Sequence, residues 1–167
     1  GKNATFLNIK ATQEQFNKRY EGYFPNMHAE SYILSNKDMY IHVYFPSSVK
    51  GTFYDVVVAF HPTKESGDEN IEFMDMKLFS NSPSFLYTYG HAYIKHDIFL
   101  KTLKSKISSK VFSDMAKTKN QYNIISYDIS IYCALKYILD KGYVTRTTIS
   151  GIKNGTTLNA MKRSVQS

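Results

Sequence analysis

Apolar and polar residues alternate most clearly in the first half of the chain. Between 39 and 45, apolar side chains take every second position, and two tyrosines and a histidine take the positions between them. Successive strand side chains point to opposite faces, so this pattern predicts a half-buried strand that ends at Pro46. Residues 53–60 are apolar on both faces apart from Asp55, which indicates a central strand. After a polar loop, residues 71–79 predict the next strand.

Segments that predict helices occur before and after these strands in the sequence. Near the start, a threonine followed three residues later by a glutamine has the spacing of a capping box, and we expect a short helix over 12–21. Residues 85–89 are a candidate fourth strand. After them the apolar positions follow helical spacing and predict a lysine-rich helix over 97–116. Residues 124–140 are apolar nearly all round, which favours a helix buried on more than one side.

Together these patterns predict one α+β domain over residues 1–167, with a small antiparallel β-meander covered by helices. A β-branched run over 143–150 is a candidate further strand, and 158–165 predict a basic terminal helix. Residues 1–10 predict a flexible arm or a short strand. The sequence stops at Ser167 without a terminating signal, so we expect a truncated C-terminus.

Charge and aromatic content narrow the range of partners. The chain carries 21 Lys and Arg against 14 Asp and Glu, a formal net charge of +7, which favours an anionic partner such as DNA or a membrane surface. Arginine, the usual residue for bidentate base recognition, is scarce, and this argues against sequence-specific DNA reading. The 14 tyrosines suit protein interfaces, because each has an apolar ring and a polar tip.

Other features exclude whole classes of protein. The single cysteine, Cys133, excludes a disulfide framework and a cysteine-based zinc site within one chain. No apolar run approaches the roughly 20 residues that span a bilayer, and no signal-peptide pattern begins the sequence. The histidines lack metal-site spacing, so we expect each to be a packing or surface residue. They are His28, His42, His61, His91 and His96.

One pattern has the composition of a catalytic site. Asp75 and Lys77 lie two apart on a predicted strand and so share a face, and Asp55 lies near the start of the preceding strand. This arrangement resembles the PD-(D/E)XK nucleases. The resemblance implies that Asp55 and Asp75 bind Mg²⁺ and that Lys77 orients the attacking water. The alternative interpretation is an ordinary ion pair on one face of the sheet.

Two further segments, 77–89 and 126–138, resemble stretches of virion-associated structural proteins of tailed phages that infect low-GC bacteria. The resemblance implies a small subunit of a larger assembly.

Three functional hypotheses follow. The first is a non-enzymatic structural or assembly subunit of a phage virion, put together in the host cytoplasm. It would need no cofactor, would contact other protein subunits and DNA, and would form a homo-oligomer. The second is the Mg²⁺-dependent nuclease, and the third is a basic nucleic-acid-binding module, for which the aromatic segment 85–93 is the candidate surface.

Overall fold

The computed structural model describes residues 16–118, 120–152 and 154–165, and it confirms the α+β class. The predicted arm over 1–10 lies outside these ranges. Five strands form one sheet in the order β4-β3-β2-β1-β5. The strands are β1 (His28–Ile33), β2 (Met39–Pro46), β3 (Phe53–His61), β4 (Asp75–Ser80) and β5 (Asn154–Gly155). Strands β1 to β4 form the predicted antiparallel meander, extended by one strand, and β5 runs parallel to β1.

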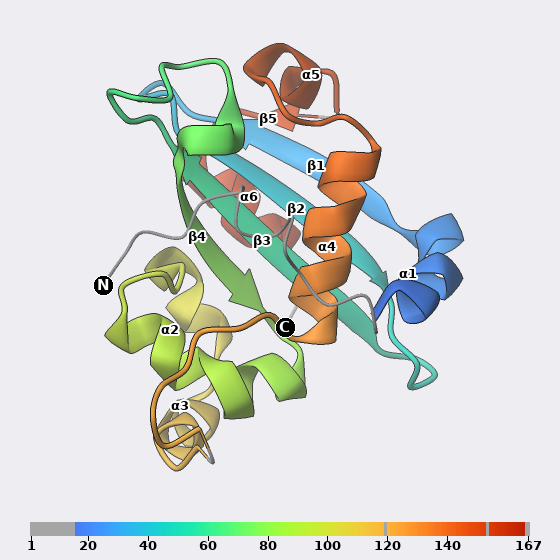
Figure 1. Ribbon diagram of the computed structural model, residues 1–167, viewed down its shortest axis with the longest axis vertical. Coiled ribbons are helices and arrows are strands. Elements are labelled where there is room, and N and C mark those ends of the chain that lie inside the picture. The colour runs from blue at the N-terminus through green and yellow to red at the C-terminus, as the bar shows by residue number, and fades with distance from the viewer. Residues whose placement is uncertain (1–15, 119, 153, 166–167) are drawn as a thin grey trace.

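Helices cover both faces of the sheet. In Figure 1, α4 lies across one face, α6 lies behind the strands, and α2 and α3 gather beyond the end of β4. The α-helices are α1 (Asn17–Tyr23), α2 (His91–Lys95), α3 (Ser109–Met115), α4 (Ile129–Asp140), α5 (Arg146–Ser150) and α6 (Leu158–Ser164). Tighter or wider helical turns are η3 (Phe24–Asn26), η4 (Ile71–Phe73), η5 (Phe85–Gly90) and η6 (Lys101–Lys106).

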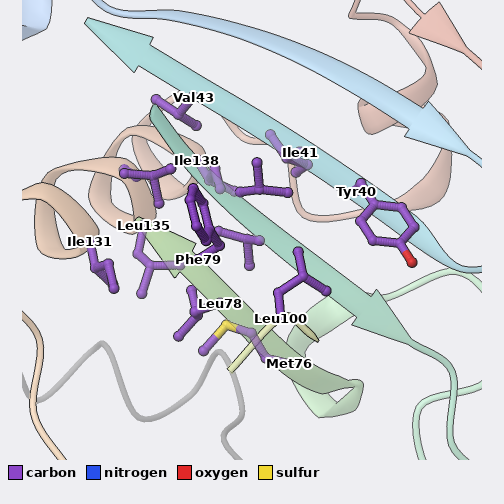
Figure 2. Packing of buried hydrophobic residues seen from close by; sticks show 14 of the residues in the cluster. Tyr40, Ile41, Val43, Met76, Leu78, Phe79, Leu100, Ile131, Leu135 and Ile138 are labelled. Carbon is purple, nitrogen blue, oxygen red and sulfur yellow. The ribbon is translucent and has the colours of Figure 1, made fainter. Parts of the chain in front are cut away.

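The main core lies between α4 and the sheet. Ile131, Leu135 and Ile138 recur at helical spacing and are fully buried. Figure 2 shows these three side chains among the apolar side chains of the strands, including Ile41 and Val43. Burial of each such side chain contributes about 1.5–3 kcal/mol, so this contact holds α4 on the sheet.

The start of α4 is fixed by a polar network, and this corrects the predicted range 124–140. Asp128 caps the helix by accepting a hydrogen bond from the Ile131 amide at 3.1 Å. Its carboxylate also accepts from Ser84 and from Ser130, and Ser130 lies 2.6 Å from Ser80 at the end of β4. The helix therefore begins at Ile129, because the Asp128 side chain satisfies an otherwise unpaired amide there.

Two predicted strands are corrected. The range 71–79 begins four residues too early, because Ile71–Phe73 forms a 3₁₀ turn before β4. The candidate strand 85–89 is a π-helix that continues into α2. Helical geometry here brings the buried Phe85 ring 4.9 Å from the Tyr93 ring. Packing of the aromatic rings has thus outweighed the β-propensity of the segment.

The predicted helix over 97–116 is broken. Residues 98–100 run alongside β4, where the Leu78 amide donates to Ile98 O and the Leu100 amide donates to Leu78 O. The chain then forms η6, and Ser108 caps α3 by accepting from the Val111 amide at 3.2 Å. Leu78 thereby gains backbone partners at the exposed edge of β4, which a straight helix would not provide.

Of the three remaining predicted segments, one strand is absent from the described residues and two helices are present. The range 143–150 is not a strand, because Thr145 and Thr148 form a reciprocal capping box that starts α5. The terminal helix is confirmed as α6, and the helix predicted over 12–21 is observed as α1, with residues 12–15 outside the described ranges. In the described part of the chain, every helix is too short or too polar to cross a bilayer.

Candidate functional site

The three residues that resembled a nuclease site do not come together. Asp75 lies opposite His61 in the pairing of β3 with β4, and Lys77 follows on the same face. Asp55 precedes His61 by six residues on β3, which at about 3.3 Å per residue places it roughly 20 Å away along the strand. Lys77 instead donates to Asp97 at 3.4 Å. The structure therefore keeps Asp75 and Lys77 on one face and leaves Asp55 at the other end of the sheet.

Asp55 and Asp75 also have no neighbouring side chains, among the described residues, that would complete a metal site. Within 16–118, 120–152 and 154–165, no three His, Cys, Asp or Glu side chains are grouped so that they could hold a metal ion. The absence of a cofactor stays a prediction, as does the nuclease alternative, which has no assembled ligand set to support it.

A polar pocket of about 670 Å³ opens on the face of the sheet that is covered by α6. We call it the polar pocket. Its lining is contributed by the first three strands, the turn between β2 and β3, the residue after β4, and the end of α6. The lining residues are Glu30, His42, Tyr44, Gly51, Phe53, Asp55, Asn81, Arg163 and Ser164. Asp55 is thus part of a candidate site, although with neighbours other than those predicted.

Ser164, His42 and Asp55 form a continuous hydrogen-bonded chain in the wall of the polar pocket. The His42 Nε2 atom lies 2.7 Å from Asp55 Oδ1, and the Nδ1 atom lies 3.1 Å from Ser164 Oγ. His42 is 1% exposed and Asp55 is 6% exposed. Buried charges require partners, and the imidazole is the partner that this structure gives to the carboxylate.

The Asp55 carboxylate favours one tautomer of a neutral His42. A carboxylate accepts hydrogen bonds, so a neutral imidazole beside Asp55 carries its single N–H on Nε2. The His42 Nδ1 lone pair then faces the Ser164 hydroxyl. Ser164 Oγ also donates to Met161 O at 2.6 Å in its own helix, and it lies within hydrogen-bond reach of the Tyr32 hydroxyl. Rotation about the Cβ–Oγ bond would direct its single proton to the imidazole instead.

The β2–β3 hairpin sets the position of the histidine and the aspartate. Tyr44 lies opposite Asp55, and His42 lies opposite Val57. Residues two apart on a strand share a face, so His42 is the diagonal neighbour of Asp55 on the side that meets α6. The register of one hairpin therefore creates the His–Asp pair.

A close approach of the backbone brings the serine to this pair. Gly155 lies in β5, directly before α6, and a Cβ atom there would be 2.7 Å from the Tyr32 ring and 3.2 Å from the Ala160 Cβ. Glycine lets the chain lie against β1 at this point. The helix that follows then ends with Ser164 above His42.

Both acidic and basic side chains surround the hydrogen bonds between Ser164, His42 and Asp55. Glu30 accepts a hydrogen bond from Tyr32 at 2.9 Å, and Arg163 is an exposed cation at the rim of the polar pocket. Burial, together with the nearby carboxylates of Glu30 and Asp55, raises the pKa of Tyr44. Tyr44 therefore stays a neutral aromatic wall at neutral pH.

A second surface is apolar and lies on the loop between α3 and α4. Tyr122, Ile124 and Ile125, which we call the apolar loop, are 79%, 60% and 38% exposed. Asn120 holds the loop in shape, because its side chain donates to Ile124 O and accepts from the Ile124 amide. Asn123 adopts a left-handed backbone conformation with φ 52°, which closes the turn. Three large apolar side chains are thus exposed on a hydrogen-bonded turn.

Lysines lie on the elements that lead to the apolar loop. Lys104 and Lys110 are exposed, and the Lys117 side chain is 77% exposed just before the loop. The loop is anchored to the π-helix by a hydrogen bond from Thr118 to Thr88 O, and Tyr93 donates to Ser126 O at its far end. Exposed lysines thus precede the apolar loop in the sequence, and Lys117 lies 3.7 Å from the Asp114 carboxylate.

Comparison with family models, curated proteins and solved structures found no match to this chain.

The sequence contained a signal for part of the polar pocket. Both predicted strands of the hairpin carry its residues, and the six-residue turn that the structure forms between β2 and β3 pairs Tyr44 with Asp55 and places His42 beside it. The prediction of a polar packing residue agrees with the buried, hydrogen-bonded position of His42, but spacing did not reveal its partners. Ser164 has no such signal, because only the packing of α6 brings it to the sheet.

Proposed function

We propose that the protein is an assembly subunit that binds another protein chain through the apolar loop. The observation that carries this proposal is the exposure of Tyr122, Ile124 and Ile125 on one ordered turn. Large apolar side chains exposed together in a soluble protein mark interaction sites. Tyrosine is also enriched where interfaces are tight.

Hydrogen bonds within the turn favour a role of the apolar loop in binding. Asn120 makes two hydrogen bonds to the backbone of Ile124. A loop that already has its bound shape loses little conformational entropy on association. The apolar loop is therefore suited to enter a groove in a partner without rearrangement.

Charge indicates which kind of partner fits. The exposed lysines Lys110 and Lys117 lie in the helix that precedes the loop and at the start of the loop, and the whole chain carries +7. Two copies would bring like charges together, which disfavours self-association at this surface. The occupant we propose is a different chain, with an apolar centre and acidic residues at its border.

The resemblance to virion-associated phage proteins gives the setting of this proposal. The two resembling segments, 77–89 and 126–138, are joined through the network of Ser80, Ser130 and Asp128. The resemblance thus covers one local unit, at the place where β4, the π-helix and α4 meet. A phage particle is the assembly we propose, and its other proteins are the candidate partners.

Site-specific photo-crosslinking tests the proposal. Benzoylphenylalanine replaces Tyr122 in one variant and Val49 in a control, and both are produced in cells that make the complete particle. Val49 is 64% exposed but lies in the β2–β3 turn. We expect a discrete adduct with another particle protein at position 122 and none at 49. A Tyr122→Ser, Ile124→Ser double variant should abolish incorporation while keeping the fold.

Other results would overturn this choice of partner. Adducts only between copies of the chain would make the surface a homo-oligomer contact. Adducts with DNA, together with strong salt dependence of DNA binding, would favour the nucleic-acid module and a role for Lys110 and Lys117. Equal crosslinking at 122 and 49 would leave the apolar loop without a specific partner.

A further inference from the structure

The proposed function leaves the polar pocket unused, and the inference below does not depend on it. We propose that the polar pocket is a hydrolytic site for small carboxylic esters. Ser164 is the nucleophile and His42 is the general base. Asp55 is a positioning residue that acts through His42. The proposal rests on the distances of 3.1 Å and 2.7 Å that link these three side chains in the wall of an open pocket.

The geometry contains the parts that acyl transfer to a serine requires. A hydroxyl is a weak nucleophile until a base in hydrogen-bond reach takes its proton. His42 Nδ1 is within that reach, and the pairing of Nε2 with Asp55 keeps the basic lone pair directed at the serine. The arrangement is recognised by the roles of its members and not by their order in the sequence.

Ser164 Oγ attacks the ester carbonyl carbon, and its proton passes to His42 Nδ1. The tetrahedral intermediate expels the alcohol, which takes the proton from His42. A water molecule then attacks the acyl-serine and loses a proton to His42, and His42 returns that proton to Ser164 Oγ as the bond between the acyl carbon and Oγ breaks. The products are a carboxylic acid, an alcohol and free Ser164, and no oxidant or metal takes part.

The rest of the pocket indicates the substrate. Phe53 is 54% exposed and, with Tyr44, forms an aromatic wall beside Asp55. Such a wall favours an apolar acyl group. Arg163 is adjacent to the nucleophile in sequence and lines the same pocket, which suits it to stabilise the negative oxygen of the intermediate. A short aliphatic or aromatic ester matches these surroundings.

A second serine in the same local setting provides the control. Ser150 is the last residue of α5, and its hydroxyl donates to Thr147 O at 2.8 Å. Ser164 is likewise the last residue of α6 and bonds to the carbonyl three residues before it. Among the described residues, the hydrogen bonds of Ser150 do not include a histidine. The two serines therefore share the bond to their own helix, and Ser164 differs in lining the polar pocket and in its contact with His42.

Labelling with a fluorophosphonate tests the proposal. The full chain is incubated with the reagent, in which the serine oxygen displaces fluoride from phosphorus, and the labelled peptide is identified by mass spectrometry. We expect one adduct, at Ser164, and slow turnover of p-nitrophenyl acetate with an initial burst. Ser164→Ala should abolish both, whereas Ser150→Ala should leave both unchanged.

Variants of the other two residues separate catalysis from structure. Asp55→Asn keeps the shape of the side chain but permits the wrong imidazole tautomer, and we expect labelling to slow by about 10²–10⁴-fold. His42→Gln should slow it by a similar factor, with folding checked by circular dichroism. If a variant fails to fold, Ser164→Cys in the wild-type background gives the readout. Its thiol should react with iodoacetamide faster than that of Ser150→Cys.

Two results would overturn the proposal. The first is a folded wild-type chain that shows no adduct at Ser164 under conditions that label a known serine esterase. The second is an adduct at Ser164 whose rate does not change in Asp55→Asn or His42→Gln. Either result would make the three residues a structural link that fastens α6 to the sheet.

Discussion

Asp55 provides the sharpest energetic test of the structure. Replacement by alanine removes the carboxylate and leaves the His42 Nε2–H without its partner at 2.7 Å. A hydrogen bond to a charged group contributes about 1.5–3 kcal/mol, and breaking a fully buried ion pair costs about 3–5 kcal/mol. Asp55 lines the polar pocket, so water can enter the vacated space and solvate His42. We therefore expect Asp55→Ala to lower the free energy of unfolding by about 2–3 kcal/mol.

Equilibrium unfolding in urea, followed by far-ultraviolet circular dichroism, measures this change. At the m-values usual for small proteins, the midpoint should fall by about 1 M. Asp75→Ala is the matched control. Asp75 is half-buried in β4, and no hydrogen bond or ion pair of its carboxylate is recorded in the described part of the chain. Its replacement should change the free energy of unfolding by no more than about 0.5 kcal/mol.

A double-mutant cycle then assigns the cost to the pair. In a His42→Leu background the Asp55 carboxylate is buried without a partner, so its removal should be neutral or stabilising. The coupling energy between the two substitutions should exceed about 1 kcal/mol. Equal effects of Asp55→Ala and Asp75→Ala, or additive effects in the cycle, would refute the reasoning that the buried pair stabilises the fold.

Four further predictions concern the core and the ionisable groups. Leu135→Ala should lower the free energy of unfolding by about 2–5 kcal/mol in urea melts, because it opens a cavity in a fully buried site. Asp128→Ala should cost about 1–2 kcal/mol in the same melts, because it removes the cap of α4. Burial raises the pKa of the Cys133 thiol to about 12, so Ellman's reagent should leave the native protein unreacted at pH 8 and should react in denaturant. Burial also raises the pKa of Tyr127 to about 12, and the folded state then keeps protons that the unfolded state has lost. Stability should therefore fall as pH rises from about 9 to 12, by up to about 1.4 kcal/mol per pH unit for each such group, measured by urea melts across that range.

The strands that could be predicted are those whose burial, alternating or continuous, appears as a pattern of apolar residues in the sequence. In β2 the apolar positions meet α4 and the tyrosines and histidine meet the other face, so alternation revealed the strand. In β3 nearly every residue between Asp55 and Phe60 is buried, which matches its place between β2 and β4. Within the described residues, the short strand β5 pairs with β1 at one edge of the sheet, and it has no apolar pattern of its own from which it could have been predicted.

The segments that were wrongly predicted are those in which specific side-chain contacts, near or distant in sequence, outweigh the propensity of the segment. The run of aromatic and β-branched residues over 85–89 reads as a strand, but the Phe85 ring packs between Tyr93 and Phe99. The β-branched run over 143–150 is a helix, because the capping box that starts at Thr145 satisfies backbone amides locally. The secondary-structure propensities of the residues alone predict neither interaction.

The polar pocket shows the same division between local and distant contacts. His42 and Asp55 belong to one hairpin and are 13 residues apart, so the turn between β2 and β3 is sufficient to pair them. Ser164 is 122 residues from His42, and it reaches the pair only because Gly155 allows the chain before α6 to lie against Tyr32. A residue whose position depends on such a close approach cannot be found from spacing or periodicity. It follows that loosening α6 would remove the serine from the pocket while leaving the His–Asp pair in the sheet intact. The proposed hydrolytic site and the stability of the hairpin are therefore separable properties of this fold.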